Sequence, residues 1–378
     1  MNSERVRVVL AAGGTGGHVF PAEALAAQLR ERGIQPVLFT DRRGVSFGGE
    51  AQVRRIRGGG IAGQTRWRRL RGLAALGAGC LQAAWALRRL SPGAVVGFGG
   101  YASVPTVFAA SVSALPTIIH EQNAVLGRAN RMLARRAGRI ATAFETVSHL
   151  PKGAEEKAVR TGMPVRAAFA RLRERPYQPP EAGGPIRVLV LGGSQGARVF
   201  GEVLPAAIDR LTARWRTRLA ITQQCRPEAL AGVEEAYRRI GVAAELSSFF
   251  EDVPQRLAAA HLLISRAGAS SVAEMTSVGC PAMLIPYPHA ADDHQTANAR
   301  AIVDAGGAWL IPQDEFTPEH LSARLDELFA HPQMLAAAAA ASRAAGFDRA
   351  AARLADLVLE VMGTEPPEAV MAAGRLAA

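Results

Sequence analysis

Short apolar runs alternate with longer amphipathic segments along most of the chain. Runs of strand length occur at residues 6–11, 37–40, 95–98, 117–119 and 139–143, and again at 186–191, 217–222, 242–246, 262–264, 281–285 and 308–311. Segments with helical periodicity lie between them or follow them, at about 20–32, 317–329, 333–345 and 347–362. Strands that alternate with helices predict an α/β protein with doubly wound parallel sheets.

One pattern of elements begins at two places in the chain. A strand, a glycine-rich turn and a helix begin at Val6 and begin again at Ile186, after a segment rich in proline and glycine. A chain of 378 residues also suits two domains better than one. We therefore predict domains at residues 1–161 and 162–345, a C-terminal helix at about 346–363 that packs back on the first domain, and a frayed tail at 364–378. Residues 42–65 are expected to form an irregular loop.

Three glycine-rich turns follow predicted strands, at 13–17, 97–101 and 192–196. Glycine lets a backbone approach a ligand that a β-carbon would hold away, so these turns indicate a ligand rich in phosphate. Their spacing is neither GxGxxG nor that of a P-loop, and we expect no dinucleotide cofactor. The histidines are scattered and no carboxylate pair stands at ligand spacing, so we predict no metal site and no cofactor.

Residues 262–298 carry the most specific pattern in the chain. A buried strand is followed by a turn, by Ser270 and Ser271 at the start of a helix, and by Glu274 one turn later. Helix amides and two hydroxyls suit a phosphate, and a carboxylate one turn on suits the hydroxyls of a ribose. The alternative is that Ser270 and Glu274 only cap the helix. We predict a nucleotide-diphosphate site.

Polar residues also follow the predicted strand at 117–119, where the sequence reads His120-Glu121-Gln122-Asn123. The carboxyl edge of an open α/β sheet is where ligands bind. His18, at the end of the first glycine turn, is the best-placed general base, and its alternative role is to cap the following helix.

The net charge of +11 is unevenly distributed. Residues 1–160 hold 23 Arg and Lys against 9 Asp and Glu, whereas residues 161–378 hold 21 against 24. An anionic membrane surface or nucleic acid could match the basic half. Within it, residues 66–90 combine apolar residues and tryptophans with arginines at both ends, which suits either a helix in a membrane interface or an ordinary core helix.

The remaining composition points to a reducing compartment. The three cysteines are far apart, no signal-peptide pattern opens the chain, and no apolar stretch is long enough to span a membrane.

Together the motifs resemble the MurG family of bacterial glycosyltransferases. The resemblance lies in GGTGGHVFPA at 13–22, GFGGYAS at 97–103, HEQN at 120–123, GGSQGAR at 192–198, SRAGASSVAE at 265–274 and HQTANA at 294–299. It implies a GT-B fold, with two Rossmann-like domains facing a cleft. It also implies an inverting, metal-independent transfer of N-acetylglucosamine from UDP-N-acetylglucosamine to the 4-hydroxyl of the muramoyl sugar of undecaprenyl-diphosphate-linked muramoyl-pentapeptide, a step of peptidoglycan synthesis that serves cell shape and division.

The resemblance also assigns residues. It implies His18 as the catalytic base, with Glu121 as the alternative. For the donor it implies Thr15, Gly16, Gly17, Asn123, Arg166, Ser194, Phe250, Ala269, Ser270, Ser271, Val272, Ala273, Glu274 and Gln295. For the acceptor diphosphate it implies Gly14, Thr15, Gly16, Gly99, Gly100 and Tyr101. The family usually has Asn where this chain has Met163, in Met163-Pro164-Val165-Arg166.

The same resemblance favours membrane docking by residues 66–90. The implied patch comprises Trp67, Arg68, Arg69, Leu73, Leu76, Trp85, Arg88 and Arg89. It places the protein peripherally on the cytoplasmic face of the bacterial inner membrane, with an anionic membrane surface and other cell-wall synthesis and division proteins as partners. Nucleic acid is not expected as a partner, because no recognition helix or aromatic platform is present. The alternative enzyme is a UDP-N-acetylglucosamine 2-epimerase on the same fold.

Overall fold

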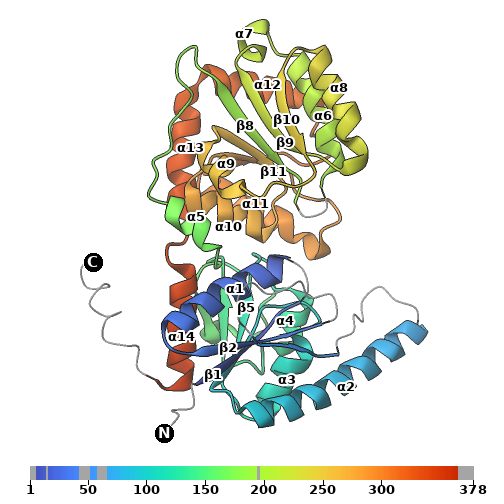
Figure 1. The fold of residues 1–378 in the computed structure, drawn as a ribbon, viewed down its shortest axis with the longest axis vertical. Helices are drawn as coiled ribbons and strands as arrows, with labels where there is room; N and C mark the ends of the chain where they lie inside the picture. Colours follow the sequence, from blue (N-terminus) through green and yellow to red (C-terminus); the bar gives the residue numbers. More distant parts are fainter. Residues whose placement is uncertain (1–5, 14–15, 42–51, 58–65, 194–195, 365–378) are drawn as a thin grey trace. The chain divides into compact units, whose positions relative to one another are not determined.

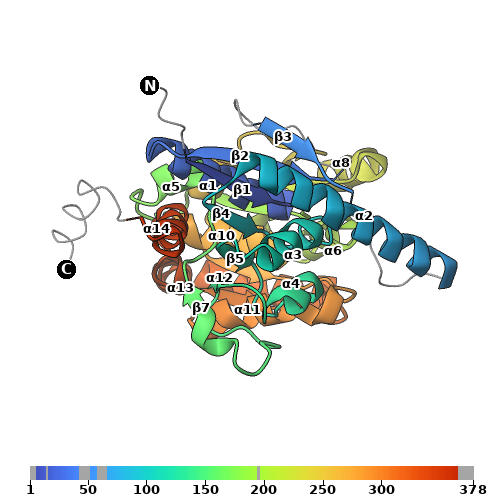
Figure 2. The ribbon, with the colours of Figure 1, turned by 90° about the horizontal axis from the view of Figure 1, so that it is seen from below.

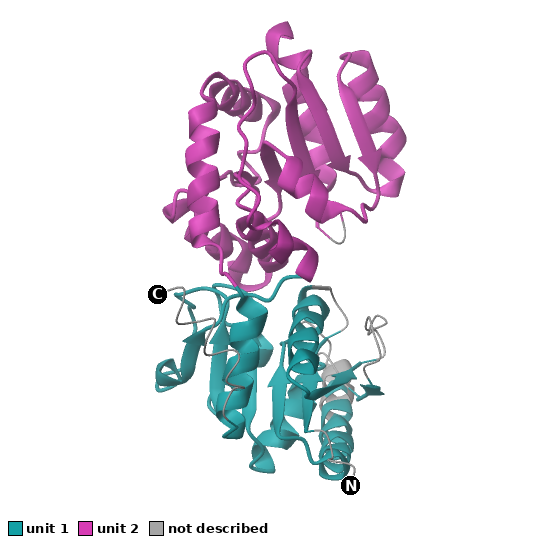
Figure 3. Ribbon diagram, turned by 60° about the vertical axis from the view of Figure 1, so that its left-hand side comes forward, with its two compact units in different colours: residues 1–166, 349–378 teal, residues 167–348 magenta. Residues whose placement is uncertain are grey.

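The computed structural model describes residues 6–13, 16–41, 52–57, 66–193 and 196–364, with the side chains of 66–71 and 73 excepted. The chain divides into two compact units, coloured separately in Figure 3. The first contains residues 1–166 and 349–378, and the second contains residues 167–348. The first boundary therefore falls at Arg166, whereas the sequence pattern had suggested residue 161.

The first unit is a parallel sheet with helices on both faces. Its described strands follow the order β3-β2-β1-β4-β5-β6-β7. The strands are β1 (Arg7–Ala11), β2 (Gln35–Thr40), β3 (Gln52–Arg55), β4 (Ala94–Gly97), β5 (Thr117–Glu121), β6 (Arg139–Thr142) and β7 (Ala158–Arg160). The helices are α1 (Gly16–Glu31), α2 (Arg66–Leu90), α3 (Val104–Val112), α4 (Arg128–Leu133) and α14 (Ala350–Met362).

The second unit repeats this plan, with the strand order β10-β9-β8-β11-β12-β13 (Figure 1). Its strands are β8 (Ile186–Leu191), β9 (Leu219–Gln224), β10 (Ala243–Ser247), β11 (Leu262–Ser265), β12 (Ala282–Leu284) and β13 (Ala308–Leu310). Its helices are α5 (Ala167–Leu172), α6 (Arg198–Asp209), α7 (Ala213–Arg216), α8 (Leu230–Arg239), α9 (Val253–Ala259), α10 (Ala269–Val278), α11 (His294–Asp304), α12 (Pro318–Ala330) and α13 (Pro332–Ala345). Two doubly wound parallel sheets confirm the predicted fold class.

Each sheet has one point at which the strand order reverses. In the first unit it lies between β1 and β4, where Ala11 pairs with Gly97. In the second it lies between β8 and β11, where Leu191 pairs with Ser265. Loops that leave adjacent strands in opposite directions open a crevice at their carboxyl ends, and ligands of open α/β sheets bind there. Each reversal point is flanked by a glycine-rich turn.

The first sheet is buried between two apolar layers. Buried residues of α2, α3 and α4 cover one face, and buried residues of α1 and α14 cover the other. Figure 2 shows α2 lying along α3. The buried strands read as nearly continuous apolar runs, as expected of parallel strands covered on both sides.

Four elements differ from the sequence prediction. Strand β3 lies inside the segment 42–65 that was predicted to be irregular. The prediction missed it because its sequence, Gln52-Val53-Arg54-Arg55, is mostly polar and the strand lies at the edge of the sheet. Strand β7 and helix α5 lie between the predicted strands at 139–143 and 186–191, where the sequence predicted no element, and β7 is an edge strand of three residues. Helix α1 begins at Gly16, earlier than expected, so His18 lies in its first turn.

Helix α14 packs against α1 in the first unit. Leu354 and Val358 are completely buried in that layer, and Arg32 donates a hydrogen bond to the Asp356 carboxylate at 2.9 Å. The chain thus returns to its first unit after completing the second, and the last helix contributes to the core of the first.

We predict that Leu354→Ala destabilises the protein by about 2–5 kcal/mol, because it opens a cavity between α14 and α1. The matched control is Glu360→Gln on the outer face of the same helix. It removes only the exposed Arg139–Glu360 ion pair and should change stability by less than about 1 kcal/mol. Urea unfolding measures both, and equal effects would show that α14 does not support the core.

Candidate active site

The reversal point of the first unit surrounds His18 with glycines. Gly99 and Gly100 adopt φ angles of +83° and +73°, a conformation that favours glycine strongly. A β-carbon on Gly13, Gly99 or Gly100 would lie 3.4 Å from an atom of the His18 ring. The imidazole therefore packs against the backbone of two turns, one after β1 and one after β4.

The surroundings of the imidazole determine its charge. His18 is partly buried, and its Nδ1 atom is buried without a hydrogen-bond partner among the described residues. Burial lowers the pKa of His18, and the nearby Glu121 carboxylate, the Phe98 carbonyl and Gln122 partly oppose that shift. His18 is therefore neutral at physiological pH, as a general base must be before it accepts a proton.

Glu121 occupies a different environment. Its side chain is 1% exposed, and four donors surround the carboxylate. Oε1 accepts from the backbone and side-chain nitrogens of Asn123, at 3.0 and 3.2 Å. Oε2 accepts from the backbone of Gly127 and the side chain of Asn130, both at 2.8 Å. A carboxylate that fixes four groups in this way is an anchor for the loop between β5 and α4.

Side chains of successive residues at the end of β5 point to opposite sides of the sheet. Glu121 therefore has different neighbours from His120 and Gln122. Glu121 reaches the start of α4, and its neighbours His120 and Gln122 reach elsewhere. Gln122 donates to the Phe98 carbonyl at 2.7 Å, and His120 Nε2 bonds the Gly162 carbonyl at 3.0 Å. The sequence marked the four-residue motif as polar but did not separate these roles.

The reversal point of the second unit has the same two-turn construction. After β8, Gly193 has a φ of +78°, and a β-carbon on Gly192 would lie 2.3 Å from the Ala197 nitrogen. Gln224, at the end of β9, accepts a hydrogen bond from the Gly192 amide at 3.2 Å. The sequence did not predict this hydrogen bond between Gln224 and the Gly192 amide. Ser194, Gly14 and Thr15 lie outside the described residues.

Helix α10 begins directly after β11, with Gly268 in an extended conformation before it. The first-turn amides of Ala269, Ser270 and Ser271 have no acceptor within the helix, as at any helix N-terminus. Ser270, Ser271, Ala273 and Glu274 are all partly exposed. Val272, which the resemblance placed among the donor contacts, is buried, and its amide bonds the Gly268 carbonyl at 3.0 Å. Val272 therefore belongs to the core.

Arg266 is a further residue that the sequence did not single out. Its guanidinium donates to the carbonyls of Ile285 and Pro286, both at 3.1 Å, and to Gln313 at 2.6 Å. It thereby fixes the loop that leaves β12. Gln295 fixes the same loop from α11, because its side-chain oxygen accepts from the Tyr287 amide at 2.9 Å. The amide nitrogen of Gln295 remains the group with which it could donate to a ligand.

The other predicted site residues are distributed over both units. In the first unit, Arg166 lies 5.1 Å from the centre of the Phe20 ring, and Tyr101 follows the second glycine turn. In the second unit, Phe250 is buried, and the guanidinium carbon of Arg256 lies 4.4 Å from the centre of the Phe250 ring. The buried ring supports the backbone around it.

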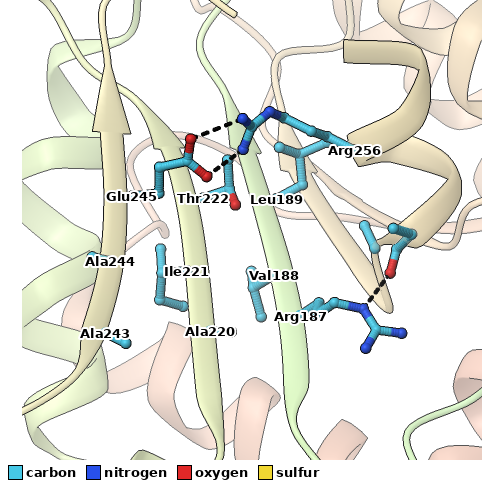
Figure 4. Close-up of a pocket in the computed structure, with 12 residues that line it drawn as sticks. Arg187, Val188, Leu189, Ala220, Ile221, Thr222, Ala243, Ala244, Glu245 and Arg256 are labelled. Carbon is cyan, nitrogen blue, oxygen red and sulfur yellow. Dashed lines mark hydrogen bonds and ion pairs between the residues drawn. The ribbon is translucent and has the colours of Figure 1, made fainter. Parts of the chain in front are cut away.

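A separate pocket of about 490 Å³ lies along β8, β9 and β10 in the second unit (Figure 4). Its lining is mostly alanine and branched aliphatic residues. The charged groups at its rim are already engaged: Arg256 pairs with Glu245, and Arg187 donates to the Ala259 carbonyl at 2.7 Å. It contains none of the predicted site residues, so we do not assign it to the nucleotide site.

Some residues of the predicted membrane patch are buried in the structure and others are exposed. Leu76 is buried against α3 and the sheet, so it belongs to the core and cannot be part of a surface patch. Leu81 and Trp85 are 77% and 56% exposed, and Arg89 lies over the Trp85 ring at 4.1 Å. Arg88 is also exposed. The side chains of Trp67, Arg68, Arg69 and Leu73 lie outside the described residues. Helix α2 is thus a core helix on one side and an apolar, basic surface on the other.

Within the described residues, no helix is long and apolar enough to cross a membrane. No cluster of histidine, cysteine and carboxylate side chains there has the arrangement of a metal site.

Comparison with known proteins assigns the chain to a family. The model of the glycosyltransferase family 28 N-terminal domain matches residues 8–142, and that of the C-terminal domain matches residues 187–354. A protein of Paramagnetospirillum magneticum, named UDP-N-acetylglucosamine–N-acetylmuramyl-(pentapeptide) pyrophosphoryl-undecaprenol N-acetylglucosamine transferase, is 55% identical over 97% of this chain and 99% of its own. A protein of the same name from Rhodospirillum centenum is 55% identical over 94% of each chain.

The chain belongs to the MurG family of glycosyltransferases.

Solved structures agree with this assignment. The crystal structure of Acinetobacter baumannii MurG is 30% identical, covers 94% of this chain and 99% of its own, and superposes with a TM-score of 0.77. A UDP-N-acetylglucosamine 2-epimerase structure superposes with a TM-score of 0.66 at 13% identity, which shows a shared fold and nothing more. The motifs identified in the sequence therefore lie in a glycosyltransferase.

We predict that Glu121→Gln acts mainly on stability. The substitution replaces one acceptor oxygen by an NH2 group that faces existing donors, so it should lower the melting temperature clearly, at about 1–3 kcal/mol for each buried donor left unsatisfied. His18→Gln should leave the melting temperature nearly unchanged, because His18 Nδ1 has no partner to lose. Differential scanning calorimetry compares them. An unaltered melting temperature for Glu121→Gln would contradict the anchoring role.

Proposed function

We propose that the protein transfers N-acetylglucosamine from UDP-N-acetylglucosamine to the 4-hydroxyl of the muramoyl sugar of undecaprenyl-diphosphate-linked muramoyl-pentapeptide, with inversion at the anomeric carbon. The observation that carries this proposal is the 55% identity, over nearly the full length, to a transferase named for this reaction. The neutral, glycine-packed His18 supports it, because the reaction requires a base for a sugar hydroxyl.

The proposed chemistry is a single displacement. The 4-hydroxyl oxygen of the acceptor forms a bond to C1 of N-acetylglucosamine while the bond from C1 to the UDP oxygen breaks. His18 Nε2 takes the hydroxyl proton. UDP leaves with an additional negative charge, which amides at a helix N-terminus and a guanidinium can stabilise.

The second unit supplies the groups that suit the donor. In the proposed arrangement, the first-turn amides of α10, with Ser270 and Ser271, face the diphosphate, and Glu274 accepts from the ribose hydroxyls. Ser194 of the second unit and Arg166 of the first also contact the diphosphate. Gln295 of the second unit and Asn123 of the first contact the sugar. The glycine turns at Gly14–Gly16 and Gly99–Tyr101 bind the acceptor diphosphate in the first unit.

We propose that the exposed face of α2 docks on the membrane that holds the lipid acceptor. Leu81 was not part of the predicted patch, but among the side chains of α2 that the structure describes, it and Trp85 are the exposed large apolar ones. Arg88 and Arg89 add positive charge beside them, which suits an anionic lipid surface. This proposal places the protein peripherally on the cytoplasmic face of the inner membrane, where it would meet other cell-wall synthesis and division proteins.

The reaction is tested by UDP release from UDP-N-acetylglucosamine in EDTA, with and without a short-chain lipid-linked muramoyl acceptor. We expect release only with acceptor. His18→Gln should lower turnover by roughly 10²–10⁴, as is typical when a general base is lost. UDP release without acceptor would instead indicate an epimerase, and near-normal turnover of His18→Gln would reject the base assignment.

Membrane docking is tested by sedimentation with vesicles that contain anionic lipid. Leu81→Glu combined with Trp85→Glu should abolish most binding, whereas turnover of a water-soluble short-chain acceptor should be preserved. Val159→Glu, an exposed apolar position on β7 of the same unit, is the control and should bind vesicles like the wild type. Equal vesicle binding by all three proteins would contradict docking by α2.

A further inference from the structure

The donor contacts proposed above lie at the beginning of α10, and their position depends on what holds the other end of that helix. The helix has ten residues and is about 15 Å long, at about 1.5 Å per residue. A helix of this length is a rigid element, so a displacement of its last turn is carried to the amides of its first turn. The supports of its C-terminal end are therefore part of the geometry of the donor site.

Arg343, in the last turn of α13, holds the C-terminal end of α10. Its Nη2 atom donates a hydrogen bond to the Val278 carbonyl at 2.8 Å. The side chain also packs on Gly279, which ends α10 with a φ of +70°, and a β-carbon there would lie 2.8 Å from Arg343 Nε. The last carbonyls of a helix lack partners within the helix, and a cation that donates to one of them stabilises that end.

The chain that follows α13 makes a second contact with the same end. Gly346 lies against the Thr276 carbonyl, because a β-carbon on Gly346 would lie only 2.3 Å from that oxygen. Gly346 has a φ of −66° and a ψ of 147°, which other residues adopt readily, so contact with α10 is what excludes a side chain here. Figure 1 shows α5, α10 and α13 lying together in the second unit. The last turn of α10 therefore has no room to move toward this segment.

Arg343 is itself held by the segment through which the chain enters the second unit. The same Nη2 atom donates to the Arg175 carbonyl at 2.6 Å. Arg173 Nη2 donates in return to the carbonyls of Arg343 and Gly346, at 3.1 and 3.4 Å. The second unit comprises residues 167–348, so these contacts join its entering segment to its leaving segment. Both segments thus support α10 through two arginines.

The two guanidiniums repel each other, and this cost must be offset by other contacts. Burial, and then the charge of Arg173, lowers the pKa of Arg343. The Asp348 carboxylate lies 3.9 Å from Arg173 Nε and offsets part of the repulsion. The backbone carbonyls that both side chains hold offset more of it, and these carbonyls are the groups whose position the pair fixes.

We propose that Arg343, held in place by Arg173, is a positioning residue for the donor. It fixes the C-terminal end of α10 and thereby the place at which the first-turn amides and Glu274 meet UDP-N-acetylglucosamine. This inference rests on the proposed function, because it requires the donor diphosphate to bind at α10. It adds two residues that belong to neither the donor set nor the acceptor set and that act through the helix.

The first test measures binding of UDP by isothermal titration calorimetry, at a temperature well below the melting temperature of every variant. Arg343→Met removes the cation and its hydrogen bonds. It should weaken UDP binding by about 10-fold, the loss expected when one hydrogen bond to a charged group is broken. Arg343→Lys retains a cation that can donate to Val278, and it should bind UDP nearly as tightly as the wild type.

A second variant displaces the same end of α10 without removing a charge. Gly346→Ala places a methyl group against the Thr276 carbonyl, where the distance would be 2.3 Å, so α10 or its support must shift. This variant should also weaken UDP binding. Its control is Gly232→Ala in α8, where the new methyl group meets no described atom within 4 Å, and UDP binding should be unchanged.

Kinetics separate the donor from the acceptor. Arg343→Met should raise the KM for UDP-N-acetylglucosamine and lower kcat by up to about 100-fold, the effect of a misplacement of about 1 Å. The KM for the short-chain acceptor should stay unchanged, because the acceptor contacts are proposed for the first unit. A general loss of stability would not distinguish the two substrates.

The matched control for Arg343→Met is Arg218→Met in the same unit. Arg218 also donates to two backbone carbonyls, those of Gly184 at 2.7 Å and Glu181 at 2.8 Å, but not to α10. This variant should lower the melting temperature without changing the affinity for UDP.

Wild-type UDP affinity in both Arg343→Met and Gly346→Ala would overturn the inference, and so would an equal loss of affinity in Arg218→Met. If Arg343→Met does not fold, Gly346→Ala and its control decide. UDP binding needs neither acceptor nor turnover, so these results stand apart from the UDP-release assay. Failure of that assay in a wild-type protein that binds UDP would overturn the proposed function instead.

Discussion

The first unit depends on the close approach of two backbone turns to one imidazole ring. The turns after β1 and β4 meet because Ala11 pairs with Gly97 at the point where the strand order reverses. Positive φ angles at Gly99 and Gly100 let the second turn fold back over His18. This one contact fixes the position of His18, and the burial that it brings lowers the pKa of the ring.

The strand next to this contact separates support from chemistry. Along β5, His120 and Gln122 support the segment at Gly162 and the turn at Phe98, while Glu121 on the other side of the sheet holds the start of α4. Each of these three buried side chains forms a hydrogen bond with a backbone group of a neighbouring segment and so orients that segment. Polar residues are costly to bury unless they are hydrogen-bonded, so this concentration at one strand end reflects the precision that the site requires.

The fold was largely predictable because its information is local and periodic. Apolar runs of three to six residues marked the buried strands, and glycine turns marked the ends of several of them. The edge strand β3 was missed because its sequence, Gln52-Val53-Arg54-Arg55, is mostly polar, and the edge strand β7 was missed because it has only three residues. Helix α5 was hidden for a related reason, since it is short and lies in a segment rich in proline.

The sequence predicted which residue types belong to the site, but it did not predict which of these residues support the structure and which face the ligand. The motifs identified His18, Ser270 and Glu274 from spacing, but spacing does not reveal that Val272 faces the core or that Leu76 packs inward. Arg266, Gln122 and Gln224 were missed because each acts through a hydrogen bond to a backbone group distant in sequence. Such contacts exist only once the sheets have formed.

The most direct test of the account is the identity of the product formed from UDP-N-acetylglucosamine and a short-chain lipid-linked muramoyl acceptor. Mass spectrometry and NMR of the purified product should show one N-acetylglucosamine added to the muramoyl sugar in the β configuration. An α linkage would contradict the single displacement with His18 as base. Formation of an epimerised sugar nucleotide, with the acceptor unchanged, would contradict the transferase itself.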